Sequence, residues 1–439
     1  MSSTSKGLAV AAASLAAAGI LAWKAFASAA SEKNSRRRPR FVVGIDLGAT
    51  NAKAGVMDDA GKLVASATSP LVAAAGGDGG VVDSHSPEAV VAALVACTRA
   101  AVAQAGLDLR GDVAAVGVGS PGHILGGVVK AAANFPAWRD VPLAMLLGAA
   151  LGKPVRLVND ADAALLAEVW VGAAAAKGGS VLGRGAPDDV VLVTLGSGVG
   201  VAVLAGGALL RGSRGLIEGG HTIVHLGASA SDVLLPDVGG GGRAGRAAEP
   251  RECGCGQRGC IEAYVSANSV RRRFHEARLQ KRLLSPVKGG GGSEADFEAR
   301  EAREAAMGAA DIYALAETYA SGASSRAAAS GDGGGCSAAA ADPLATLAAA
   351  VTETTAECLA ALVVNLCRAY DPSVVLLGGG MAAAPDSVLL DPLRRKFEAA
   401  RWTCLPDHVV IARAELGAEA GLVGAAATVR FFLQSGEGR

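Results

Sequence analysis

Short apolar runs alternate with longer amphipathic stretches along the chain after residue 40. Phe41–Gly48 is apolar, rich in β-branched residues and ends in a glycine turn, so it predicts a buried strand. Lys53–Met57 and Lys62–Ser66 follow across turn residues and predict a β-meander. Further on, the pattern predicts helices over 87–106, 143–151 and 161–176 and strands over 113–119 and 155–158. This alternation predicts an α/β layered domain.

The pattern then restarts in the second half. Residues 189–204 repeat the strand, glycine turn and strand of residues 42–56. This repetition predicts an internally duplicated α/β fold with a boundary near residues 178–189. A helix over 344–370, a strand over 374–377 and a final helix from Glu419 complete the second half. Two low-complexity tracts, 239–248 and 321–342, predict disordered surface insertions.

Composition excludes one class of partner. The 439 residues carry 41 lysines and arginines and 41 aspartates and glutamates, so the chain has no basic footprint for nucleic acid. The length suits two domains, and aromatic residues are only 4%, so Val, Leu and Ala must build the core.

The first forty residues form a separate segment. Residues 7–23 are uncharged, residues 7–30 contain only Lys24 as a charge, and an arginine cluster follows at 36–40. Alanine and serine with few acids favour an organelle transit peptide for a plastid or mitochondrion. The apolar run with flanking arginines equally favours a membrane anchor that holds the protein on the cytosolic face of an organelle membrane. A cleaved secretory signal is a third interpretation.

Three of the eight cysteines lie within the eight residues of Cys253–Cys260, separated by glycines. Cys253, Cys255 and Cys260 with His221 have the donor types of a closed structural zinc site. The alternatives are a disulfide cluster or chance, and disulfide frameworks belong to short secreted chains. His225 is a rival ligand. Zinc here would fix a loop and carry out no chemistry itself.

Three glycine-rich turns follow apolar strands, at Asp46–Asn51, at Leu195–Gly200 and at Gly378–Gly380. Glycine allows a turn whose N–H groups face a phosphate, and an aspartate at a strand end offers oxygen ligands to magnesium. Three such turns together favour a nucleotide site, although one alone is also an ordinary hairpin. The chain contains no Walker loop.

Asn159-Asp160 ends a predicted strand and begins a predicted helix. Asp160 is either an ordinary helix cap or a general base that takes the proton of an attacking hydroxyl.

From about Phe41 to Phe432 the chain resembles the ROK sugar kinases of the hexokinase and actin-like ATPase group. The resemblance rests on Asp46–Thr50, Gly119–Gly122, Val158–Ala163, Leu195–Gly200, Glu218–His221, Cys253–Glu262 and Leu377–Gly380. It implies a duplicated actin-like, ribonuclease H-like α/β fold with a nucleotide and sugar cleft between two lobes, residues 41–180 and 181–439. The second lobe would hold the zinc loop and the insertions.

The resemblance also implies roles for individual residues. Asp160 would be the catalytic base. The residues implied as sugar ligands are Gly119, Asn134, Asn159, Asp160, Glu218, His221 and Glu262. The residues implied around ATP and Mg²⁺ are Asp46, Gly48, Thr50, Asn51, Lys53, Gly196, Ser197, Gly198 and Gly379. Ala49 stands where the family often has glycine, and Ser197 where it often has threonine, and both residues are small enough to keep the turn.

The expected activity is ATP-dependent phosphorylation of a hexose at its 6-hydroxyl, with glucose as the first candidate. An N-acylhexosamine kinase or a fructokinase is the alternative, because the same ligands bind hydroxyls common to these sugars. A sugar-sensing regulator of the family is a further alternative. The resemblance also implies a homodimer.

Overall fold

The computed structural model describes residues 41–71, 74–75, 81–82, 84–175, 187–215, 217–224, 250–284, 302–329, 342–401 and 409–435. The N-terminal segment with its predicted targeting or anchoring role, the tract 239–248 and His225 lie outside the described residues. The chain divides into two compact units, each described here by itself. Unit 1 comprises Met1–Pro187, Leu209–Ile217 and Glu415–Arg439, and unit 2 comprises Asp188–Ala208 and Glu218–Ala414.

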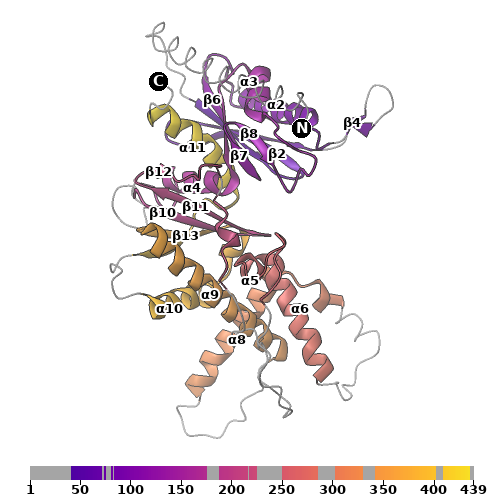
Figure 1. Cartoon of the computed structure of the whole chain (residues 1–439), viewed down its shortest axis with the longest axis vertical. Helices are drawn as coiled ribbons and strands as arrows, with labels where there is room; N and C mark the ends of the chain where they lie inside the picture. The colour runs from indigo at the N-terminus through magenta and orange to yellow at the C-terminus, as the bar shows by residue number, and fades with distance from the viewer. Residues whose placement is uncertain are drawn as a thin grey trace, which may run out of the picture. The chain divides into compact units, whose positions relative to one another are not determined.

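Unit 1 is built on a five-stranded sheet of order β3-β2-β1-β6-β9 (Figure 1). Its strands are β1 (Phe41–Leu47), β2 (Asn51–Met57), β3 (Leu63–Pro70), β6 (Val113–Ser120) and β9 (Val155–Asn159). The first three form an antiparallel meander, whereas β1, β6 and β9 run parallel. The carboxyl ends of these three parallel strands therefore share one edge of the sheet.

Both faces of the sheet are buried at β1, which explains why this strand reads as a nearly continuous apolar run. Val43 and Ile45 pack in a core with α2 (Pro87–Gln104) and α3 (Leu143–Leu151). Val42 packs in a second core with α4 (Asp160–Trp170) and α11 (Ala420–Ser435). Four short strands complete the described part of unit 1: β4 (Ala74–Ala75), β5 (Val81–Val82), β7 (His123–Leu125) and β8 (Val128–Ala131).

Helix α11 lies very close to the sheet. An added Cβ at Gly44 would lie 2.0 Å from the Leu422 carbonyl, and one at Gly117 would lie 1.7 Å from the Ala425 carbonyl. On the other side of α11, a Cβ at Gly424 would lie 1.6 Å from the Ala163 carbonyl of α4. Because the obstacles are backbone atoms, only glycine permits this packing.

The second sheet has the order β12-β11-β10-β13-β14, which repeats the first sheet strand for strand (Figure 1). Its strands are β10 (Val190–Leu195), β11 (Val199–Ala205), β12 (Ala208–Leu209), β13 (Val374–Gly378) and β14 (Val410–Arg413). Again an antiparallel hairpin comes first, and β10, β13 and β14 run parallel. The repeated order confirms the predicted duplicated actin-like fold.

The helices of unit 2 share one core with one face of this sheet. They are α5 (Glu262–Val265), α6 (Ala267–Leu284), α8 (Ala309–Ala329), α9 (Pro343–Tyr370) and α10 (Leu390–Ala400), with short 3₁₀ turns η1 (Gly219–His221), η3 (Gly380–Ala383) and η4 (Asp386–Val388). Helix α9 lies in the core with Val191 and Val193 of β10. By length and composition, α2 and α9 would be long and apolar enough to cross a membrane, but their apolar residues pack in these cores.

The structure differs from the sequence predictions at three places. Helix α4 ends at Trp170 rather than 176, because the Glu168 carboxylate accepts the Ala173 N–H and the chain turns there. Residues 321–329, predicted to be disordered, are the end of α8, since alanine is the strongest helix former. Leu209–Ile217 and the C-terminal segment from Glu415 belong to unit 1, although both were assigned to the second lobe.

Candidate active site

Two aspartates of unit 1 lie at the edge where its parallel strands end. Asp46 is near the end of β1, and Asp160 follows β9 as the first residue of α4. Gly119 of β6 lies between them in the sheet, because it pairs with Asp46 on one side and with Val158 on the other. The alternation of strand and helix therefore brings Asp46 and Asp160 together, although more than a hundred residues separate them.

Asn159, rather than Asp160, caps helix α4. Its Oδ1 accepts the Ala161 N–H at 2.9 Å, and its Nδ2 donates to the Gly122 carbonyl at 3.1 Å. Asp160 Oδ1 also accepts the Ala161 N–H, at 2.9 Å. The helix start therefore has the amide side chain of Asn159 as its cap and does not depend on the Asp160 carboxylate alone.

Burial sets the acidity of these carboxyls. Burial raises the pKa of Asp160, while hydrogen bonds from the helix start lower it less. Burial also raises the pKa of Asp46; the Asp160 charge raises it further and Lys53 opposes both. Asp162 has its pKa raised to about 6 by burial, against the opposing charge of Arg211, whose guanidinium lies 3.5 Å away. A raised pKa makes a carboxylate a stronger proton acceptor.

The first glycine turn connects β1 to β2. The Gly48 N–H donates to the Asn51 carbonyl at 3.0 Å, and the Leu71 N–H donates to the Thr50 carbonyl at 2.7 Å. Lys53 is the cross-strand partner of Asp46. Thr50 and Asn51 are exposed at the tip and linked by a 3.1 Å hydrogen bond. The turn therefore presents polar side chains beside the Asp46 carboxyl.

The other two glycine turns lie together in unit 2. The Gly196 N–H donates to the Gly198 carbonyl at 3.0 Å, which closes the β10–β11 turn. Asn268 Nδ2 holds the Ser197 carbonyl at 3.1 Å. Gly379 has φ +83°, and an added Cβ would lie 2.4 Å from the Leu195 carbonyl, so glycine is required there. Since β10 and β13 are parallel neighbours, both turns lie at one edge of the sheet.

Glu262 connects this turn to the cysteine loop. Its Oε2 accepts the Val199 N–H at 2.9 Å, directly after the glycine turn. A Cβ at Gly198 would lie 2.7 Å from the same oxygen, so the missing side chain makes room for the carboxylate. The Cys253 thiol donates to Glu262 Oε1 at 3.7 Å. The orientation of this carboxylate is therefore fixed from both sides.

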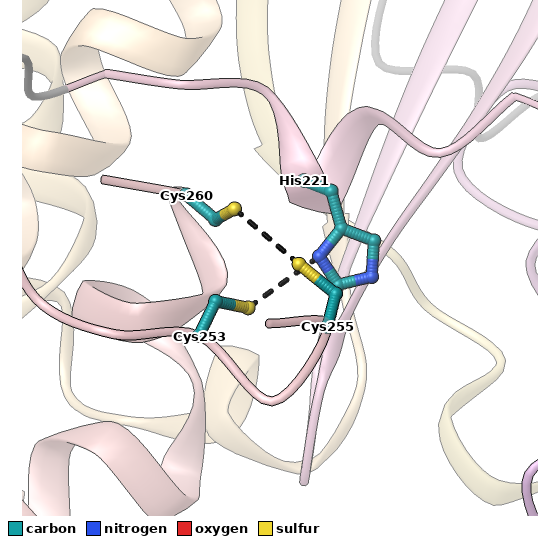
Figure 2. A group of neighbouring side chains, drawn as sticks. All are labelled: His221, Cys253, Cys255 and Cys260. Carbon is teal, nitrogen blue, oxygen red and sulfur yellow. Dashed lines mark hydrogen bonds between the residues drawn. The ribbon is translucent and has the colours of Figure 1, made fainter. Parts of the chain in front are cut away.

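The four predicted zinc ligands point toward one another (Figure 2). Their ligand atoms all lie within 4.8 Å of one another. Cys253 Sγ lies 3.6 Å from His221 Nδ1, and Cys255 Sγ lies 3.7 Å from Cys260 Sγ. A tetrahedral ion with about 2.3 Å bonds to sulfur and about 2.0 Å bonds to nitrogen requires edges of roughly 3.8 Å and 3.5 Å. The donor set and its spacing fit zinc.

Backbone pairing brings the histidine to the cysteines. Ile223 forms a bridge with Cys260, and the Ile261 N–H donates to the Thr222 carbonyl at 2.9 Å. At Gly220, next to His221, a Cβ would lie 1.9 Å from the Val199 carbonyl. The glycines of the motif thus let η1 pack on β11, and this packing places the imidazole.

The remaining predicted ligands are exposed. Glu218 precedes η1 in unit 2, where its carbonyl accepts the His221 N–H at 3.0 Å. Asn134 lies in unit 1, in a tight turn closed by the Phe135 N–H to the Ala132 carbonyl at 3.1 Å. The predicted residues thus form two groups. Unit 1 holds Asp46, Gly48, Thr50, Asn51, Lys53, Gly119, Asn134, Asn159 and Asp160, and unit 2 holds Gly196, Ser197, Gly198, Glu218, His221, Glu262, Gly379 and the three cysteines.

Sequence reasoning missed several residues of these groups. His85 places its Nε2 3.0 Å from the Ala49 carbonyl of the first glycine turn. Asp162 is a third carboxyl near Asp160 and is partly buried, and Arg211 faces it from a segment about fifty residues away. The only sequence signal for Asp162 was the repeated acid in Asp160-Ala-Asp162, and it did not indicate that Arg211 is the partner of Asp162.

Comparison with known proteins gives one consistent result. The model of the ROK family matches residues 42–316 and 313–431. A glucokinase of Thermotoga maritima is 28% identical over 396 residues, covering 89% of this chain and 97% of that protein. The ROK hexokinase of Thermus thermophilus has 29% identity and a TM-score of 0.58, covering 90% of this chain and 100% of that one. A ROK family glucokinase from Streptomyces griseus, solved with glucose and AMPPNP, has 27% identity and a TM-score of 0.54, covering 89% and 99%.

Proposed function

Because the chain belongs to the ROK family, we propose that it is an ATP-dependent hexose kinase that phosphorylates the 6-hydroxyl, with glucose as its first substrate. The observation that carries this proposal is the placement of Asp160. It is a carboxyl with a raised pKa at a strand end, next to Asp46, on a helix whose cap is the Asn159 side chain. The relatives named glucokinase extend over nearly the whole chain, which supports glucose as the substrate.

In the proposed reaction Asp160 accepts the proton of the sugar hydroxyl as its oxygen attacks the γ-phosphorus of ATP. The new oxygen–phosphorus bond forms while the bond to the β-phosphate oxygen breaks, and ADP leaves. The turns Asp46–Asn51 and Leu195–Gly200 would face the phosphates through backbone N–H groups other than those of Gly48 and Gly196, which close the turns. The residues proposed to bind sugar hydroxyls are Asn159, Glu218, His221 and Glu262.

Asp46 would hold Mg²⁺, which neutralises charge on the phosphoryl oxygens when bound. Lys53 balances the charge of the partly buried Asp46 carboxyl when the ion is absent, since its own charge lowers the pKa of Asp46. Zinc on His221, Cys253, Cys255 and Cys260 would supply a structural clamp and no chemistry. The clamp would fix Cys260, two residues before Glu262, and thereby the loop that bears this carboxylate.

A sugar panel tests the proposal. Purified full-length chain is mixed with ATP, Mg²⁺ and, in turn, glucose, fructose, mannose, N-acetylmannosamine and N-acetylglucosamine, and ADP release is recorded. The highest kcat/KM is expected for glucose. A higher kcat/KM for an N-acylated amino sugar or for fructose would identify that sugar, and not glucose, as the preferred substrate. No sugar-stimulated ADP release with any of them rejects the kinase and favours a sugar-sensing protein.

We also propose a homodimer, and organelle targeting or membrane anchoring through residues 7–30. Light scattering of the purified chain tests the first, and a monomer at assay concentration rejects it. Imaging of the full chain against a version lacking residues 1–40 tests the second, and identical distributions reject it.

A further inference from the structure

Glu168 is a fully buried carboxylate that the proposed reaction does not use. It lies near the end of α4 with 0% of its surface exposed. Its Oε2 accepts the Ala173 N–H at 2.7 Å and the Glu415 N–H at 3.1 Å, and its Oε1 accepts the Leu416 N–H at 2.9 Å. Burying an ionised carboxylate is costly unless hydrogen bonds replace its water shell, so this arrangement requires all three donors.

The three donors come from two separate segments. Ala173 follows α4 directly, whereas Glu415 is the residue at which the chain returns from unit 2 to unit 1. Glycine at position 172 leaves room for the carboxylate, because an added Cβ there would lie only 2.1 Å from Glu168 Oε2. Glu168 therefore fastens the returning chain to the end of the helix that begins with Asp160.

The returning chain leads directly to the other aspartate of unit 1. From Leu416 it passes through η5 (Gly417–Glu419) into α11. At Gly421, in the first turn of α11, an added Cβ would lie 2.9 Å from the Asp46 carboxyl carbon. With α11 also in close backbone contact with the sheet, a shift of its start is transmitted to the Asp46 carboxyl.

We propose that Glu168 is a positioning residue for phosphoryl transfer: by holding Glu415 and Leu416 it fixes the start of α11 and, through Gly421, the Asp46 carboxyl. The inference rests on the proposed function, in which Asp46 holds Mg²⁺. It assigns a role at the active site to a side chain that touches neither substrate.

The test compares Glu168→Gln with the matched control Lys153→Met in the full-length chain. Glutamine has nearly the same shape, but its NH₂ group faces a backbone N–H where an oxygen accepted a hydrogen bond. Lys153 is also a buried charge of unit 1 bonded to backbone, since its Nζ donates to the Arg110 and Val113 carbonyls at 2.7 and 2.6 Å. Both changes are expected to lower the unfolding temperature.

Only Glu168→Gln is expected to act on the site. In the free protein, amide hydrogen exchange at Glu415 and Leu416 should accelerate. The Mg²⁺ concentration for half-maximal rate should rise about tenfold, as expected for loss of a charge-assisted hydrogen bond. Glucose affinity without nucleotide should stay within about twofold, since the change reaches Asp46 and leaves the sugar ligands in place.

Unchanged exchange at Glu415 and Leu416, or a Mg²⁺ dependence equal to that of Lys153→Met, overturns the inference. If Glu168→Gln does not fold, Gly172→Ala is measured in the same way, because its methyl group displaces the carboxylate without removing the charge. If neither variant folds, Glu168 serves folding alone and the inference is rejected. An inactive wild-type chain would reject the proposed function instead. The exchange result would still show whether Glu168 holds Glu415 and Leu416.

Discussion

Replacing Gly198 by alanine tests the link between the glycine turn of unit 2 and the Glu262 carboxylate. The new methyl carbon would lie 2.7 Å from Glu262 Oε2, closer than any carbon–oxygen contact allows. The obstacle is the end of a side chain, so we expect the carboxylate to move and the backbone to stay. The 2.9 Å hydrogen bond from the Val199 N–H is then lost.

The expected fall in kcat/KM follows from the loss of that one hydrogen bond. A hydrogen bond to a charged group contributes about 1.5–3 kcal/mol. Each 1.36 kcal/mol is a factor of ten, so kcat/KM for glucose should fall roughly 10- to 150-fold. Because Glu262 is proposed to bind sugar hydroxyls that do not react, the loss should appear mainly as a higher KM, with kcat within about threefold of the wild type.

Steady-state kinetics with varied glucose at saturating ATP measures this split, and calorimetric titration of glucose measures the binding directly. Gly254→Ala is the matched control, because a Cβ there meets no atom within 4 Å. It should leave both constants unchanged. An unchanged glucose KM in Gly198→Ala, or an equal rise in Gly254→Ala, would refute the reasoning.

Three further predictions concern metal and pH. Cys255→Ser should reduce zinc in the purified chain from stoichiometric to substoichiometric and raise the glucose KM, as elemental analysis and kinetics will show; full zinc occupancy contradicts the site. kcat should fall as the pH is lowered through the raised pKa of Asp160, because a protonated base accepts no proton; a kcat that stays constant down to the pH at which the chain unfolds contradicts this. Asp162 has a folded pKa of about 6 against 3.8 for the free group, so its contribution to stability should be lost as the pH rises through this window, by at most about 3 kcal/mol. Asp162→Asn should flatten that dependence in urea unfolding at a series of pH values, and an unchanged slope argues against the assignment.

The sequence was sufficient to predict the elements that have regular patterns. Leu143–Leu151 and Val374–Leu377 were located within one residue of α3 and β13, because apolar periodicity and flanking glycines mark them. The restart at residue 189 likewise revealed the duplication that the two sheet orders confirm. The Cys253–Cys260 spacing with His221 located a cluster whose atoms do converge.

Contacts between distant segments could not be predicted in this way. Nothing around Glu168 indicates that its carboxylate receives the N–H groups of Glu415 and Leu416, about 250 residues later. The close approach of Gly421 to the Asp46 carboxyl could not be predicted either, since a glycine in an alanine-rich helix has many explanations. Residues 321–329 were predicted wrongly because their serines and glycine were given more weight than their alanines, although the segment continues α8.

The central claim is that Asp160 is the base for phosphoryl transfer to a bound hexose. The most direct measurement is glucose-dependent ADP release by Asp160→Asn beside the wild type, with glucose binding measured on the same samples. We predict that the variant still binds glucose while turnover falls by about 10²–10⁴-fold, the usual contribution of a positioned base. Near wild-type turnover by Asp160→Asn would contradict the account.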